Sequence, residues 1–95
     1  MATATLTWSA NPASDGVTNY RVYRSLGGSA LTPLVTLGAV LTYVDTTVPN
    51  VSQAVAYALT AMDQSGNESA RSAVVSKVVD VSPPQAPTGL DVVLG

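Results

Sequence analysis

The residue types that most often carry out chemistry are sparse in this chain. It contains no histidine and no cysteine, so the commonest general base and all thiolate chemistry are missing. Two carboxylates that cleave a glycosidic bond must stand about 5 to 10 Å apart beside a sugar site. Asp63 and Glu68 could approach each other across a loop, but no nucleophile motif accompanies them. The acidic residues are Asp15, Asp45, Asp63, Glu68, Asp80 and Asp91. We therefore expect no catalytic residue, no metal site and no cofactor.

The polar run from Asp63 to Glu68 has the oxygen-rich composition of a calcium loop. It lacks the ligand spacing and the terminal bidentate acid of the roughly 12-residue EF-hand loop. Asp, Ser, Gly and Asn are also the residues that tight turns require. We expect a hairpin loop in which these residues serve the geometry of the turn.

Charge and hydropathy limit the class of protein. The net charge is −2, and no basic patch is present that could neutralise phosphates or an anionic membrane surface. The four basic residues are scattered: Arg21, Arg24, Arg71 and Lys77. With 95 residues, of which 46% are apolar and 11% charged, the chain is expected to form one folded domain. It is not expected to bind nucleic acid or membranes.

The elements that must position these residues have the period of β-strands. Ala4, Leu6 and Trp8 alternate with threonines, which predicts a strand with one apolar face. In the segment 55–61 the inward set is expected to be Val55, Tyr57, Leu59 and Ala61. Further strands are expected at 20–24, 34–37, 41–44 and 74–81, separated by turn-forming residues. About seven short strands indicate an all-β, antiparallel two-sheet sandwich of the immunoglobulin-like class.

Four segments of the chain resemble the fibronectin type III domain in its bacterial form. The segment 6–8 resembles the second strand of that family, 20–25 the third, and 43–48 the fifth with its corner. The run from Tyr57 to Ser69 is the most specific match, and the resemblance covers residues 3–81. It implies that Trp8 lies in the core. It also implies that Tyr57 occupies the tyrosine-corner position, with its hydroxyl bonded to backbone a few residues upstream.

One feature departs from the family pattern. Its members begin with a strand of the form Pro-x-x-Leu-x-Val, which here occurs at Pro87–Val92, whereas no such motif stands before residue 3. We therefore divide the chain into a sandwich without its first strand (1–81), a proline-rich linker (82–87) and a first-strand-like segment (88–95).

The position of this segment favours donation to a neighbouring molecule. The last strand should end at the pole opposite the one where a first strand begins. The linker of six residues spans at most about 20 Å, whereas a strand of eight residues is about 27 Å long. We expect the donor residues to pack beside the acceptor residues of another copy. The donors are Leu90, Val92 and Leu94, and the acceptors are Ala4, Leu6 and Trp8. A reciprocal swap, or the start of a following repeat, are the alternatives.

The aromatic residues offer little for carbohydrate binding, which needs exposed rings. Trp8, Tyr20, Tyr43 and Tyr57 are assigned to the core by alternation or by the resemblance. Only Tyr23 is expected to point outward, beside Arg21. Carbohydrate is therefore a weak candidate partner.

These features predict a non-catalytic structural or spacer module whose partners are neighbouring domains or other copies of the chain. The resemblance implies a multidomain, secreted bacterial or phage-associated protein, located outside the cell or on a virion. Because a strand follows Met1 directly, any export signal should lie outside these residues or have been removed. The alternative is a module that binds carbohydrate or protein through its loops, at 11–18, 46–52 and 63–72.

Overall fold

The computed structural model describes residues 2–80 and 83–95. Within them the chain forms six strands and one turn of 3-10 helix. These elements are β1 (Ala2–Thr7), η1 (Ala13–Asp15), β2 (Val17–Leu26), β3 (Thr32–Leu37), β4 (Thr42–Val48), β5 (Gln53–Asp63) and β6 (Val75–Val79). The described residues include no helix that could cross a membrane. The prediction of an all-β chain is confirmed.

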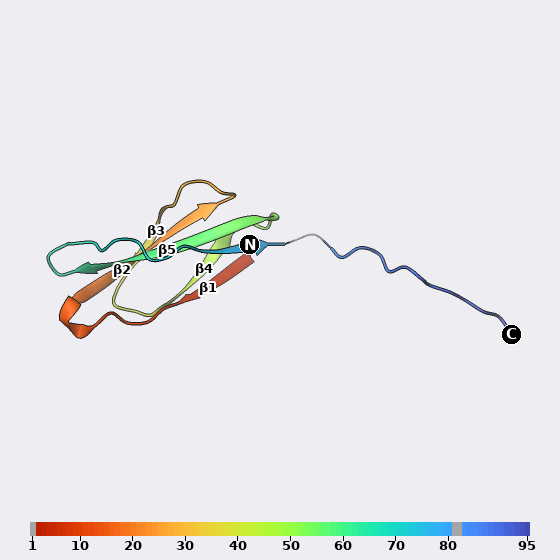
Figure 1. The fold of residues 1–95 in the computed structure, drawn as a ribbon, viewed down its shortest axis with the longest axis horizontal. Coiled ribbons are helices and arrows are strands. Elements are labelled where there is room, and N and C mark those ends of the chain that lie inside the picture. Colours follow the sequence, from red (N-terminus) through yellow and green to blue (C-terminus); the bar gives the residue numbers. More distant parts are fainter. Residues whose placement is uncertain (1, 81–82) are drawn as a thin grey trace.

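The strands form two antiparallel sheets (Figure 1). One contains β1 and β4, and the other has the order β3-β2-β5-β6. The pairing of β2 with β5 is the longest, from Val17 opposite Asp63 to Leu26 opposite Val55. Large and small side chains alternate along β5, so the larger ones share one face. The central pair β2–β5 therefore provides the frame on which the other elements lie.

One face of the four-stranded sheet contacts the β1–β4 sheet, and we call it the inner face. The ring of Trp8, just after β1, meets the ring of Tyr20 edge-on with centroids 5.6 Å apart. Arg24 of β2 reaches Asp45 of β4 over 3.0 Å. The buried apolar residues of both faces together are Tyr20, Val22, Tyr23, Val48, Val55 and Ala58. The core is therefore small, and β1 is only half buried on its apolar side.

Tyr23 lies on the other, outer face, with Arg21, but the prediction that it points into solvent was wrong. Only 7% of its surface is exposed. The connection between β5 and β6 folds over it, so that Arg71 lies 4.6 Å from the ring centroid and the Glu68 carboxylate accepts a hydrogen bond from the Tyr23 hydroxyl. Alternation correctly gave the face, but it carries no information about a loop that covers that face.

The strand boundaries also differ from those predicted. β4 continues to Val48, because Asp45 and Val48 are both buried against the other sheet. β6 occupies 75–79 of the expected 74–81, and Val81 and Ser82 lie outside the described residues.

The segment 88–95, expected to be a strand, belongs to no sheet in the single chain. Residues 83–95 extend away from the sheets (Figure 1). Leu90 is 92% exposed, Val92 72% and Leu94 90%. Without a neighbouring strand, the backbone N–H and C=O groups of an extended segment have no partner. The segment therefore does not form a β-strand in the single chain.

Candidate functional site

Two strand edges border one open groove. Among the described residues β1 pairs only with β4, and β6 pairs only with β5. Each therefore has one edge without a neighbouring strand. A groove of about 580 Å³ runs between these edges and is lined by residues of β1, β5 and β6. Free strand edges next to an apolar surface are sites at which another strand can add.

The β1 wall of the groove carries the residues that the sequence predicted as acceptors. Ala4, Leu6 and Trp8 all line it, and the threonines between them are exposed. The structure thus brings the three acceptors together, whereas the predicted donors Leu90, Val92 and Leu94 are exposed in the single chain and do not line the groove.

The floor of the groove is formed by β5. Val55, Tyr57 and Leu59 line it, as expected for the inward set. Ala61, the fourth member of the set, lines an adjoining cavity of about 240 Å³, which also contacts Trp8. The indole Nε1 of Trp8 is buried and has no hydrogen-bond acceptor among the described residues. A buried N–H group without a partner is uncommon in folded proteins.

The β6 wall contains a charge that sequence analysis missed. Lys77 pairs directly with Val55, and Val75 pairs with Tyr57. Because directly paired residues share a face of the sheet, Lys77 belongs to the inner row of β6, and it lines the groove. Apolar residues occupy both alternating positions around Lys77, so the sequence could not assign its face. The inner row of β1 is therefore apolar, whereas the inner row of β6 contains a lysine.

A buried carboxylate joins the two sheets beside this core. Asp45 is fully buried and accepts hydrogen bonds from Arg24 over 3.0 Å, from the Tyr57 hydroxyl over 2.6 Å and from the hydroxyl and backbone N–H of Thr47. Burial opposes its ionisation, but the bonds from Thr47, Tyr57 and Arg24 prevail and lower its pKa to about 2. Burial and the adjacent Asp45 carboxylate raise the pKa of Tyr57.

The prediction of a tyrosine corner at Tyr57 is corrected by this contact. Its hydroxyl donates to a carboxylate 12 residues upstream instead of to nearby backbone. A phenol has one hydrogen to donate, and a buried carboxylate is the stronger acceptor.

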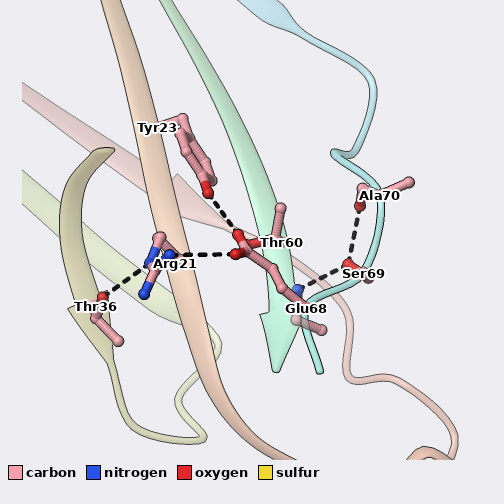
Figure 2. Close-up of polar contacts among 8 residues, drawn as sticks. Arg21, Tyr23, Thr36, Thr60, Glu68, Ser69 and Ala70 are labelled. Atoms are coloured by element: carbon pink, nitrogen blue, oxygen red, sulfur yellow. Dashed lines mark hydrogen bonds and ion pairs between the residues drawn. The ribbon is translucent and has the colours of Figure 1, made fainter. Parts of the chain in front are cut away.

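A second carboxylate holds the β5–β6 connection on the outer face. Glu68 accepts hydrogen bonds from Tyr23 and from Thr60, and Arg21 lies 3.2 Å from its other oxygen. Figure 2 shows Arg21 between Glu68 and Thr36, to which its Nε also donates. The bonds from Thr60 and Tyr23, with the nearby Arg21, lower the pKa of Glu68. From the sequence, Glu68 was expected only as an acidic residue of a loop. In the structure its carboxylate bonds the β5–β6 connection to β2 and β5.

Two serines extend the β5 edge beyond β6. The N–H groups of Ser69 and Ser72 donate to the carbonyls of Ala61 and Leu59. Their hydroxyls accept from the N–H groups of the same two residues. The connection therefore runs alongside β5 as a serine-bonded continuation of β6, and this part of β5 is not open to another strand. The motif Ser-x-x-Ser after Glu68 was the available sequence signal.

The loop after β5 has the role expected for turn-forming residues. Asp63 accepts hydrogen bonds from the backbone N–H groups of Ser65 and Asn67 and from the Asn67 side chain. Its carboxylate is thereby used within the turn. Across the described part of the chain, no group of three or more acidic residues is placed to hold a metal ion.

Comparison of the chain with protein-family models, with curated proteins and with solved structures found no match. The features that bear on function are therefore the groove, its charges and the exposed C-terminal segment.

Proposed function

We propose that the chain is a non-catalytic structural module that connects to other copies of itself, or to neighbouring domains, by exchange of a β-strand. One observation carries the proposal. The same chain contains an apolar groove between two free strand edges and an exposed segment with large apolar side chains at alternate positions, 90, 92 and 94. Side chains that alternate in this way face one side of a strand.

The energies involved favour association that depends on concentration. Burial of two leucines and one valine contributes about 5 to 9 kcal/mol in total, and each backbone hydrogen bond to β1 adds about 1 kcal/mol. Loss of translational and rotational freedom costs about 4 to 15 kcal/mol. The two sides are comparable. We expect a reversible complex rather than a permanent one.

The loop-based alternative receives less support from the geometry. The Asp63 carboxylate is used by its own turn, and the Glu68 carboxylate by the sheet. The ring of Tyr23, the one aromatic expected on the surface for stacking on a sugar, is covered. These groups stabilise the domain itself, which favours a structural role over ligand binding.

The resemblance to fibronectin type III domains suggests the kind of protein in which the module acts. In the proposed assembly a strand placed in the groove completes a two-sheet sandwich of that kind. A multidomain secreted bacterial or phage-associated protein is the context that the resemblance implies. Spacing and orientation of neighbouring domains are then the tasks of the module.

The proposal is tested by removal of the apolar row of the tail. Leu90, Val92 and Leu94 are each changed to Ser in one variant, and Val93→Ser, on the other face of the same segment, is the matched control. The tail lies outside the folded sheets, so neither variant should impair folding. Sedimentation velocity over a series of concentrations should show association of the unmodified chain and of the control, and a monomer for the triple variant.

Two results would contradict the proposal. The unmodified chain could remain monomeric at high concentration, or the control could lose association to the same extent as the triple variant. The second result would mean that the tail associates by non-specific hydrophobic contacts instead of through one face of a strand.

A further inference from the structure

We propose that the occupant of the groove is the segment 88–95 of a second copy, paired antiparallel with β1, and that Lys77 excludes the β6 edge as an alternative partner. This inference rests on the proposed function and adds the edge, the direction and the form of the assembly. It follows from three observations: the two walls of the groove, the ends at which strands begin and stop, and the position of Trp8.

The two walls offer different neighbours to an apolar strand. The inner row of β1 is apolar throughout, with Ala4, Leu6 and then Trp8. The inner row of β6 places Lys77 between Val75 and Val79. A strand paired with β6 would bring a leucine or valine directly beside the ammonium group, whereas a strand paired with β1 has only apolar neighbours. An inward-pointing lysine on an edge strand is a known protection against added strands.

The strand ends determine where the donor must begin. Ala2 pairs with Val48 and Gln53 pairs with Val79, and the short connection 49–52 joins these two places. The start of β1 and the end of β6 therefore lie at the same end of the domain, which we call the exit end because the tail leaves there (Figure 1). A strand antiparallel to β1 must begin at the opposite end, beside Trp8.

Because the tail leaves at the exit end, a second copy is the favoured donor. The tail of the same domain would have to pass along the domain before it could begin beside Trp8, and in the structure it runs away instead. The tail of another copy can approach Trp8 directly. All strand pairs among the described residues are antiparallel, and antiparallel pairing is slightly the more stable kind per residue.

The indole of Trp8 supplies the third observation. Its Nε1 is buried and has no acceptor among the described residues, and it lies at the end of the groove where the donor would begin. The backbone carbonyls of residues 87–89 would arrive at this end first. Trp8 is also the sole tryptophan of the chain, so its fluorescence should report occupation of the groove.

The consequence is an open, head-to-tail assembly. Each tail leaves at the exit end of one copy and begins at the Trp8 end of the next. Donor and acceptor surfaces differ, so the contact is heterologous, and each added copy presents a new groove or a new tail. The chain should form a ladder of species whose size increases with concentration.

Disulfide mapping tests which strand edge, β1 or β6, the donor segment pairs with and in which direction it runs. The chain has no native cysteine, so each cross-link reports one engineered pair. Asp91 and Val93 occupy the row opposite the apolar donors, and the exposed threonines occupy the same row of β1. Mixed single-cysteine variants should cross-link as Asp91→Cys with Thr7→Cys and as Val93→Cys with Thr5→Cys. A parallel strand would give the crossed combinations, 91 with 5 and 93 with 7. A strand on β6 would give Asp91→Cys with Ser76→Cys.

The expected result is the antiparallel pair of cross-links, a blue shift of Trp8 fluorescence on association, and species larger than a dimer at high concentration. Lys77→Val should allow the 91–76 cross-link to appear, whereas Lys77→Arg should not. Crossed or β6 cross-links in the unmodified background, or an assembly that stops at a dimer, would overturn this inference and leave the proposed function standing. Absence of any association would overturn both.

Discussion

Two carboxylates, Asp45 and Glu68, have nearly the same set of partners on opposite faces of one sheet. Asp45 accepts from Arg24, Tyr57 and Thr47. The second carboxylate likewise accepts from one arginine, one tyrosine hydroxyl and one threonine hydroxyl: Arg21, Tyr23 and Thr60. The two sites differ in what covers them. The side chain of Asp45 is 0% exposed, and that of Glu68 is 28% exposed.

This difference shows that a list of hydrogen bonds does not by itself give their energy. A charge that is removed from water depends entirely on its partners, and loss of any one leaves the others uncompensated. A charge that still contacts water can be solvated when a partner is lost. The inner site connects two sheets, and the outer site holds one loop on one sheet. We therefore expect removal of the carboxylate to have unequal effects at the two sites.

The largest effect is expected for Asp45→Ala. The variant leaves the Arg24 guanidinium, whose side chain is 18% exposed, without its counter-ion, and it leaves the Tyr57 hydroxyl without an acceptor. We expect a loss of about 3 kcal/mol in the free energy of unfolding, measured by urea denaturation. Asp15→Ala, at an exposed acid, is the control and should change stability by about 0.5 kcal/mol or less. Equal losses for the two variants would contradict the role of burial.

Acid titration should also show the contribution of the buried Asp45 carboxylate to stability, with a smaller effect than that of Asp45→Ala. The pKa of Asp45 is lowered in the folded state to about 2 from a reference value of 3.8. A carboxyl with a depressed folded pKa stabilises the protein above its unfolded pKa, and this contribution is lost as the pH falls through the folded pKa. The urea midpoint should therefore decrease between about pH 5 and pH 2. The decrease should be shallower in Asp45→Asn, and unchanged steepness would refute the assignment.

The sequence was sufficient to predict the strands that show a two-residue period of apolar and polar side chains. Alternation identified the strands at β1, β2 and β5, and it placed Val55, Tyr57 and Leu59 on one face. Turn chemistry gave the loop in which Asp63 caps backbone N–H groups. Both signals are local. They require only the residue itself and its near neighbours along the chain.

What the sequence could not give depends on contacts between distant segments. The acceptor of the Tyr57 hydroxyl is in the other sheet, so no local pattern pairs the two. The cover over Tyr23 comes from a connection more than forty residues further along. Alternation predicted the apolar row of Ala4, Leu6 and Trp8, but the position of Lys77 in the groove required the register of β6 against β5. The segment 88–95, predicted as a strand from its alternation, belongs to no sheet of the single chain, and a local pattern carries no information about such pairing.

The smallest effect is expected for Glu68→Gln, which completes the comparison of the two carboxylates. Gln keeps the length of the side chain and an acceptor oxygen but removes the charge that faces Arg21. Water can replace part of what is lost, because the site is partly exposed. The urea midpoint should decrease by less than in Asp45→Ala. Amide exchange should accelerate at Ser69 and Ser72, whose N–H groups hold the connection to β5, and not at the paired residues of β2. A loss as large as that of Asp45→Ala would show that the number of partners, and not burial, sets the strength of both sites.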